Sequence, residues 1–207
     1  VTVSSATPNQ NVTVTNEVIQ FGNRFGLQKQ LGDNPQGAAS DASFHFEGYC
    51  VTPAGLRVEN EWDLGAGEFG PTTQGIPTGS TCTIPESGVG DEDLIDGGAG
   101  RYSWSGVTWS SAPIDLSAHP GWAVSDDGYT VTFTLPEPLA PAEVGVLTAT
   151  NHIVENTAPL VVSKTVSGEA VGYDGSPVFH IDVDCGADGT FQADIADGGS
   201  FTFNVPA

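Results

Sequence analysis

The chain has 207 residues, 38% of them hydrophobic, which is enough for one or two domains with a sizeable core. Its formal net charge of −21 repels phosphate backbones and anionic lipid head groups, so nucleic acids and membrane surfaces are poor candidates as partners. No apolar run is long enough to span a bilayer, and 27 Gly and 14 Pro among many Val, Thr and Ser residues favour short strands over helices.

The first predicted element is a pair of strands in residues 1–18, joined by a turn at Pro8. In the second of these strands, Asn16 shares one face with three valines. A polar amide on a buried face needs hydrogen-bond partners. We therefore interpret residues 1–18 as the closing strands of a structural unit whose first part precedes residue 1.

The next strand is centred on Lys29, one of only two lysines in the chain, the other being Lys164. Each lysine alternates with apolar residues and shares a strand face with them. Both ammonium groups are therefore predicted to point into a core. An unpaired charge there is costly, so each lysine needs a compensating partner or must cease to be an amine.

The unit that contains Lys29 is predicted to extend to residue 153. Its further elements are Ala42 to Val51, a strand with Cys82, Ile84 and Glu86 on one face, an acidic loop, a hairpin of Tyr102 to Trp109, Tyr129 to Leu135, and Val144 to Ile153. The closing strand carries Asn151 on the same face as Leu147 and Ile153. Asn151 is thus a second amide directed at a core.

Parts of this unit recur along the chain at one constant spacing. Asn16 recurs as Asn151, an offset of 151 − 16 = 135, and the same offset relates Lys29 to Lys164 and Cys50 to Cys185. We therefore predict three units: the closing strands in residues 1–18, a complete repeat in 19–153, and the first part of a truncated repeat in 156–207.

Lysine, glutamate and asparagine directed into one apolar core can form an amide bond between side chains. Burial lowers the pKa of a lysine and raises the pKa of a glutamate, which favours a neutral amine and a carboxylic acid. The hypothesised steps are attack of Lys29 on the side-chain carbonyl of Asn151, with Glu86 polarising that carbonyl and shuttling protons, and release of ammonia. The alternative is a buried ion pair of Lys29 and Glu86 beside a hydrogen-bonded amide.

The same residues carry a family resemblance. The set of Leu27-x-Lys29-x-Leu31, a strand ending in Cys50, Gly79-x-x-Cys82-Thr83-x-x-Glu86 and Thr148-x-Thr150-Asn151 resembles repeated modules of Gram-positive, and most closely actinobacterial, surface proteins. Within these it is similar to the B-type Ig-like or prealbumin-like stalk domains of pilins and collagen adhesins.

The resemblance implies an all-β fold of antiparallel β-sandwich repeats in tandem, in an extracellular stalk attached to the cell wall. It implies a cross-link between Lys29 and Asn151 with Glu86 as the assisting acid, and makes Asn16 and Lys164 half-sites of neighbouring repeats. It also implies a disulfide between Cys50 and Cys82, which leaves Cys185 unpaired. The implied partners are adjacent repeats of the same protein. The sequence shows no Ser-His-Asp order, phosphate loop or paired carboxylates in a recognisable active-site setting, so we expect no cofactor and no enzymatic turnover of an external substrate.

Three other groups of residues leave alternatives open. Tyr102, Trp104 and Trp109 could form a platform for a carbohydrate or could pack in the core. Asp91, Glu92, Asp93 and Asp96 could bind calcium or form a solvated loop, and their spacing matches no EF-hand. His45 and His180 alternate out of phase with flanking Phe residues, so both are predicted on the surface; metal ligation would require companions that the sequence does not identify. The rival function is accordingly a ligand-binding adhesin module for a carbohydrate, calcium or a host protein.

Overall fold

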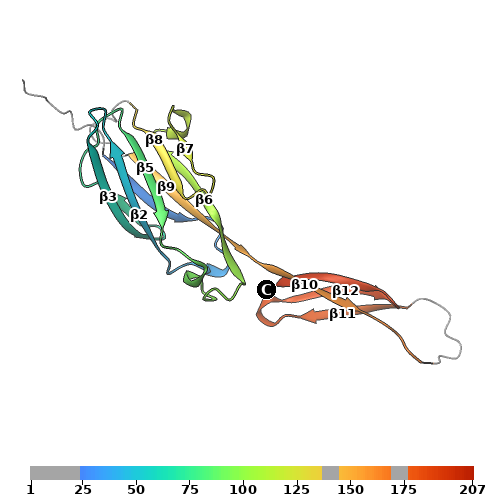
Figure 1. Ribbon diagram of the computed structural model, residues 1–207. Coiled ribbons are helices and arrows are strands. Elements are labelled where there is room, and N and C mark those ends of the chain that lie inside the picture. Colours follow the sequence, from blue (N-terminus) through green and yellow to red (C-terminus); the bar gives the residue numbers. More distant parts are fainter. Residues whose placement is uncertain (1–23, 137–144, 169–176) are drawn as a thin grey trace, which may run out of the picture.

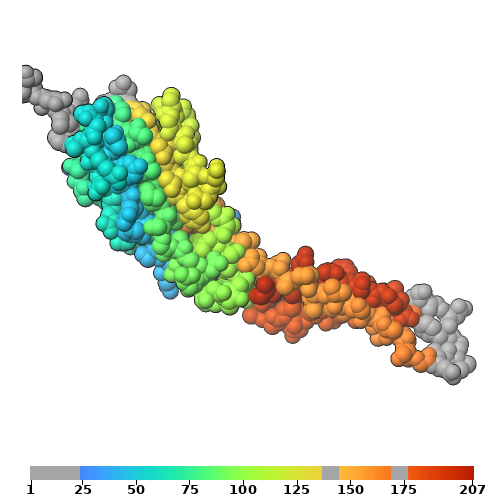
Figure 2. Space-filling model, in the orientation of Figure 1, coloured from blue at the N-terminus to red at the C-terminus, as the bar shows by residue number. Residues whose placement is uncertain are grey.

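The computed structural model describes residues 24–136, 145–168 and 177–207. These residues form an elongated all-β molecule in which a large β-sandwich is followed by a smaller pair of two-stranded ribbons (Figures 1 and 2). The predicted all-β sandwich is therefore confirmed. The predicted strands of residues 1–18, with Asn16, lie outside the described residues. Within the described ranges no helix is long and apolar enough to cross a membrane.

The sandwich consists of a five-stranded and a four-stranded sheet. The five-stranded sheet has the order β3-β2-β5-β8-β7 and comprises β2 (Ser43–Val51), β3 (Arg57–Gly65), β5 (Thr81–Ser87), β7 (Ala123–Val124) and β8 (Thr130–Thr134). The four-stranded sheet has the order β4-β1-β9-β6 and comprises β1 (Phe25–Leu31), β4 (Phe69–Pro71), β6 (Tyr102–Ala112) and β9 (Gly145–Glu155). Three short 3-10 turns connect them: η1 (Pro35–Gly37), η2 (Asp91–Asp93) and η3 (Leu116–Ala118).

Alternation of apolar and polar residues explains why these segments form strands with one buried face. On β2 the side chains of Phe44, Phe46 and Cys50 are buried, whereas His45, Glu47 and Tyr49 lie on the outer face. On β5 the inward positions are Cys82, Ile84 and Glu86. The core therefore lies between the two sheets, and the one carboxylate among these inward positions points into it.

The first and last strands of the sandwich are neighbours and run parallel. β1 pairs with β9 from Phe25 opposite Gly145 to Leu31 opposite Asn151. The other strand pairs of the two sheets are antiparallel. The expectation of antiparallel sheets therefore holds except for this one pair, which brings the two ends of the unit together.

One predicted element is wrong: residues 102–109 do not form a hairpin. They belong to the continuous strand β6, which pairs with β9 over its whole length and changes register between Trp104 and Gly106. Gly106 has φ 120°, a conformation that residues with a Cβ rarely adopt. The Ser-Gly step is thus a β-bulge within one strand, and the sequence signal for a local kink was interpreted as a complete turn.

The smaller unit contains two ribbons and one 3-10 turn. β10 (Thr157–Ser163) pairs with β13 (Ser200–Pro206), and β11 (Val178–Asp184) pairs with β12 (Thr190–Ala196), with η4 (Gly186–Asp188) between β11 and β12. Its core is small and centres on Ala193, Ile195 and Phe203. Lys164 directly follows β10, so it lies just beyond the strand in which it was predicted.

The joint between the two units is short and held by polar contacts. Only Asn156 separates β9 from β10, and its backbone N–H and side-chain amide donate to the carbonyls of Arg101 (2.7 Å) and Gly100 (2.8 Å). The guanidinium of Arg101 donates to Glu155 in the sandwich (2.8 Å) and to Asp188 in the smaller unit. β9 therefore continues almost directly into β10 (Figure 1).

Candidate cross-link site

Lys29 is completely buried between the two sheets of the sandwich. Its backbone is held in β1 by hydrogen bonds with Glu68 and Gly67, and its side chain points inward beside Leu27. The Nζ atom lies 4.0 Å from the centroid of the Phe44 ring, which covers it on the side of the five-stranded sheet. Around Nζ are the carbonyl oxygens of Gln30 (3.3 Å) and Ala149 (3.4 Å). The amine is thus shielded from water, and its polar contacts are with groups of the protein.

Asn151 lies on β9, the strand next to Lys29 in the same sheet. The parallel register pairs Lys29 with Ala149 and Leu31 with Asn151, so the two side chains lie diagonally across adjacent strands. Asn151 is 1% exposed, and its Oδ1 accepts a hydrogen bond from Lys29 Nζ. The amine of the first strand and the amide of the last strand are therefore in direct contact.

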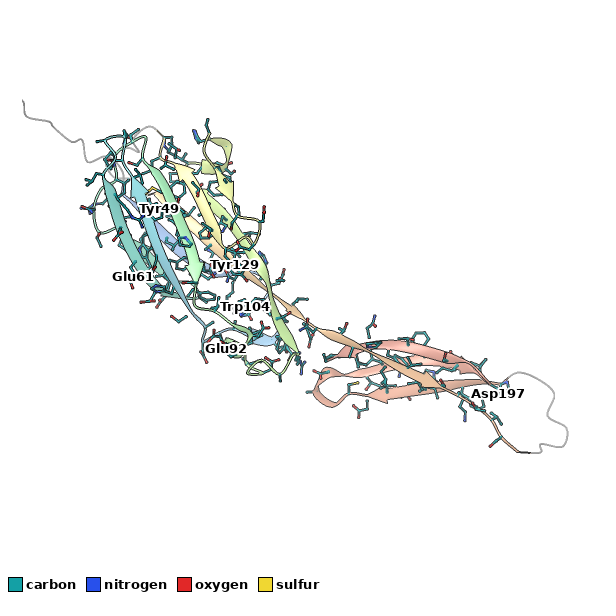
Figure 3. The ribbon with its side chains drawn as sticks, in the orientation of Figure 1. Tyr49, Glu61, Glu92, Trp104, Tyr129 and Asp197 are labelled. Carbon is teal, nitrogen blue, oxygen red and sulfur yellow. A yellow bond between two sulfur atoms is a disulfide. The ribbon has the colours of Figure 1, made fainter. Side chains whose placement is uncertain are left out.

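Glu86 reaches this pair from the opposite sheet. It follows Cys82 and Ile84 on the inward face of β5, and its backbone N–H is bonded to the carbonyl of Tyr129 (2.8 Å), a residue labelled in Figure 3. Its Oε1 accepts from Asn151 Nδ2 (2.5 Å) and lies 3.7 Å from Lys29 Nζ. Its buried Oε2 has no hydrogen-bond partner among the described residues. The structure thus brings together all three residues that the sequence singled out.

The surroundings shift the ionisation of both charged groups toward their neutral forms. Burial lowers the pKa of Lys29 to about 8, although the charge of Glu86 opposes this change. Burial also raises the pKa of Glu86, although the charge of Lys29 and the hydrogen bond from Asn151 limit the rise. Transfer of one proton from Lys29 to Glu86 leaves the proton count of the pair unchanged, so the ratio of the neutral pair to the ion pair does not depend on pH.

This arrangement has the parts needed for amide exchange. A neutral lysine amine is a nucleophile, and it contacts the amide group that it would attack. The carboxyl group contacts the amide nitrogen that would leave and lies near the amine that would lose protons. Because the fold holds all three groups in one dry site, proximity replaces the encounter of separate reactants.

Part of this arrangement recurs at the second lysine, but Lys164 is only partly buried, so the prediction that both lysines point into a core holds for Lys29 and not fully for Lys164. Lys164 Nζ lies 4.6 Å from the centroid of the Phe179 ring, and its backbone bonds to Gly199 and Gly198 as that of Lys29 bonds to Glu68 and Gly67. Phe44 and Phe179 differ by the same offset of 179 − 44 = 135 that relates the lysines. The role of these rings was not predicted from the sequence, although their spacing was a usable signal. The counterpart Asn16 lies outside the described residues.

Cys50 and Cys82 form a disulfide with an S–S distance of 2.06 Å. They lie directly opposite each other on β2 and β5 and are both buried. The bond joins the strand that carries Phe44 to the strand that carries Glu86. Cys185 is partly buried and has no disulfide partner within the described ranges.

We expect the disulfide to contribute strongly to the stability of the sandwich. It closes a loop of 32 residues, which in the chain-entropy picture stabilises the fold by about 3 to 4 kcal/mol. The double variant Cys50→Ala/Cys82→Ala should therefore unfold in denaturant with a free energy lower by about 3 kcal/mol than the parent. Cys185→Ala is the matched control and should change this value little; an equal loss in both variants would contradict the prediction.

The aromatic residues considered for carbohydrate binding pack into the sandwich. Tyr102 is buried, and Trp104 and Trp109 meet Phe44 and Phe46 edge to face at centroid distances of 5.7 and 6.4 Å. The indole N–H groups donate to the carbonyls of Gly90 (3.0 Å) and Gly128 (2.8 Å). Trp104 is labelled in Figure 3. Core packing, the second of the two alternatives, therefore describes these rings.

The acidic loop uses its carboxylates to hold its own backbone. Asp93 accepts from the N–H of Gly90 (2.9 Å), and Asp96 accepts from the N–H groups of Arg101 (2.8 Å) and Tyr102 (3.1 Å). Leu94 is buried between them and anchors the loop to the core. These contacts give the carboxylates a structural role at the beginning of β6.

Comparisons with solved structures found similarity to bacterial adhesins and a pilin. The chain is similar to a solved bacterial adhesin from Mobiluncus mulieris containing intramolecular disulfide, isopeptide and ester bond cross-links, with 25% identity, a TM-score of 0.46, and 65% of this chain and 42% of that chain covered. It is also similar to the pilus-presented adhesin Spy0125 (Cpa), with 14% identity, a TM-score of 0.37, and 66% and 28% covered. A variant of the major pilin from Streptococcus pyogenes gives 12% identity, a TM-score of 0.27, and 89% and 75% covered.

The chain thus spans less than half the length of the solved Mobiluncus adhesin. No curated protein sequence matches it. A family model described as a domain of unknown function, DUF5979, matches residues 25–153. The match begins at the first residue of β1, ends near the end of β9, and includes Lys29, Glu86 and Asn151. The chain therefore belongs to the DUF5979 family.

Proposed function

We propose that this chain is part of a structural stalk of a secreted cell-surface protein, and that its sandwich is closed by an amide bond between Lys29 and Asn151. The observation that carries the proposal is the buried contact of a lysine, an asparagine and a glutamate with perturbed pKa values. The protein acts on itself only once, so it is not an enzyme with an external substrate. Its partners are adjacent repeats of the same protein outside the cell.

The reaction balances without a cofactor. The neutral amine of Lys29 attacks the Asn151 side-chain carbonyl carbon, a C–N bond forms, and the bond to Nδ2 breaks. Glu86 takes a proton from the attacking nitrogen and delivers one to the departing nitrogen, which leaves as ammonia. Contact of Glu86 Oε1 with Asn151 Nδ2 supports this proton transfer more directly than polarisation of the carbonyl. The product replaces a buried amine by a neutral amide, which removes the cost of burying a charge.

The location of the bond fits a part that transmits tension. β1 opens the sandwich, β9 closes it, and the two strands run side by side and parallel. A force applied to the ends of the unit would pass from β1 through the amide bond into β9 and on into β10 through Asn156. The residues between Lys29 and Asn151 would carry none of it. The joint at Arg101, which links Glu155 to Asp188, supports a stiff connection between successive units.

Lys164 extends the proposal to a repeated design. Its contact with Phe179 matches the contact of Lys29 with Phe44, which supports its assignment as the amine half-site of the following repeat. Asn16 is assigned as the amide half-site of the preceding repeat. Its assignment rests on the sequence, through the shared Thr-x-Thr-Asn pattern and the offset of 135 from Asn151.

The intact mass of the reduced and denatured protein tests the bond. We expect the parent to be lighter than its calculated mass by one ammonia, and Lys29→Ala to have its full calculated mass. Lys164→Ala is the matched control because it removes the other lysine, and it should retain the deficit. Peptide mapping should recover one branched peptide joining the segments of Lys29 and Asn151. A parent at its full calculated mass would contradict the proposal.

A further inference from the structure

The outer face of the five-stranded sheet carries a group of polar residues that the cross-link does not use. His45 on β2 lies directly opposite Asp63 on β3, and in the next outward-facing row Glu47 lies directly opposite Glu61. All four side chains reach solvent: the carboxylates are 70 to 75% exposed and the imidazole is 30% exposed. Glu61 is labelled on β3 in Figure 3. The hairpin register thus assembles one imidazole and three carboxylates.

Asp63 orients the imidazole of His45. Its Oδ1 lies 2.7 Å from Nδ1, and because a carboxylate only accepts, Nδ1 carries the proton and donates it. The other ring nitrogen, Nε2, points toward the second row, 3.4 Å from Glu47 Oε1 and 4.0 Å from Glu61 Oε1. Histidines that bind metals commonly donate the N–H of one ring nitrogen to a carboxylate while the other nitrogen binds the metal. Asp63 and His45 have this relationship, and the free nitrogen of His45 lies near two further carboxylates.

A cation close to Glu47 and Glu61 would reduce the repulsion between their negative charges. Like charges directly opposite each other on neighbouring strands are destabilising. The nearby cation, Arg57, is engaged elsewhere on the same face: its Nε donates to Glu59 (3.0 Å), and its guanidinium lies 3.7 Å from the centroid of the Tyr49 ring. Among the basic groups of the described residues, His45 is the one with a nitrogen within 4.0 Å of the carboxylates of both Glu47 and Glu61.

We propose that His45 Nε2 and the carboxylates of Glu47 and Glu61 bind one divalent metal ion of the zinc class, with Asp63 as the positioning residue. Zinc ligands at about 2.0 to 2.2 Å from the metal lie about 3.3 Å from each other in a tetrahedron. The Nε2 to Glu47 separation of 3.4 Å fits this spacing, and the exposed carboxylate of Glu61, 4.0 Å from Nε2, approaches by rotation of its side chain. Three protein ligands leave one position open toward solvent. An imidazole ligand favours zinc over calcium, which takes oxygen ligands.

The smaller unit contains a natural comparison. His180 on β11 lies opposite Asp194 on β12 with Nδ1 and Oδ1 2.8 Å apart, and its Nε2 lies 3.5 Å from Asp182. The residue opposite Asp182 is Gln192, which donates to Asp182 Oδ1 (2.7 Å). The amide of Gln192 thus lies at the position that corresponds to the carboxylate of Glu61 in the first unit. It also hydrogen-bonds to Asp182, the carboxylate that would be the second metal ligand. This second group lacks one ligand and should not bind the metal comparably.

Isothermal titration of the full chain with zinc chloride at mildly alkaline pH tests the proposal. We expect one ion per chain at the tighter site, loss of that site in His45→Ala, and an affinity lower by about 10-fold to 100-fold in Asp63→Asn, which removes only the positioning contact. His180→Ala is the matched control and should leave the site unchanged. Calcium chloride should not compete.

The imidazole carbon signals in NMR spectra provide a second measurement. Zinc should shift the signals of His45 and leave those of His180 nearly unchanged, and the effect should be reversed by a chelator. All exchanged residues lie on the outer face, so the variants should retain the thermal unfolding of the parent in chelator. An unchanged affinity in His45→Ala, or equal losses in His45→Ala and His180→Ala, would overturn the assignment. The outcome is independent of the cross-link, which a mass measurement on the same samples reports.

Discussion

Pulling the chain from its two ends should extend the parent without unfolding the sandwich, whereas Lys29→Met should release a long segment in one step. The variant keeps an unbranched apolar side chain in the same space but cannot form the amide bond. Lys29 and Asn151 are 122 positions apart, and the disulfide shortens the released length by 32, so that 122 − 32 = 90 residues become extensible. This corresponds to about 300 Å of added length in single-molecule force spectroscopy.

The same experiment has internal controls. Under reducing conditions the Lys29→Met release should grow to about 400 Å, because the loop of the disulfide becomes extensible as well. Lys164→Met should behave as the parent does, since it changes the other lysine. Asn151→Ala, which retains the buried contact of Lys29 with Glu86, should give the same release as Lys29→Met. A parent that releases this segment at the same force as Lys29→Met would contradict a covalent closure of the sandwich.

Replacing Glu86 by glutamine should slow formation of the cross-link by at least about 100-fold, which is the lower end of the usual contribution of a positioned acid or base. Glutamine has the shape of glutamate and can still accept the hydrogen bond from Asn151, but it cannot exchange protons with the attacking and leaving nitrogens. The freshly purified variant should therefore have its full calculated mass and lose ammonia slowly on incubation, as followed by intact mass over time.

The matched control for this variant is Glu92→Gln, in the exposed acidic loop, which should be cross-linked completely on purification. Folding of Glu86→Gln is checked by formation of the Cys50 to Cys82 disulfide, which requires β2 and β5 to be paired. A folded Glu86→Gln protein that is completely cross-linked on purification would show that Glu86 is not the proton-transferring group.

Much of the candidate site could be predicted because strand alternation determines which side chains face the core. Lys29, Glu86 and Asn151 each share a face with large apolar residues in the sequence, and all three are buried in the structure. Two lysines in a strongly acidic chain, related by a constant offset, made these positions stand out further. Their contact followed from the shared core, since a buried charge must find a polar partner.

Other parts could not be predicted from alternation. β3 was not expected, although it pairs with all of β2, and residues 102–109 were expected to form a hairpin. The outer face of β2 shows why pairing matters: His45 and Glu47 are close in sequence, but their companions on β3 become neighbours only through the hairpin register. The sequence alone therefore identifies no metal-ligating companions for His45.

The sequence by itself determined the faces of the strands, the set of polar residues directed into the core and the repeated spacing of the lysines, because these depend on local alternation and composition. Only the tertiary structure decided which strands are neighbours. The parallel pairing of β1 with β9 sets Lys29 beside Asn151, and the packing of the second sheet brings Glu86 to them. The physical reason is that alternation specifies the direction of a side chain but not the partner or register of its strand, which follow from burial of both sheets together.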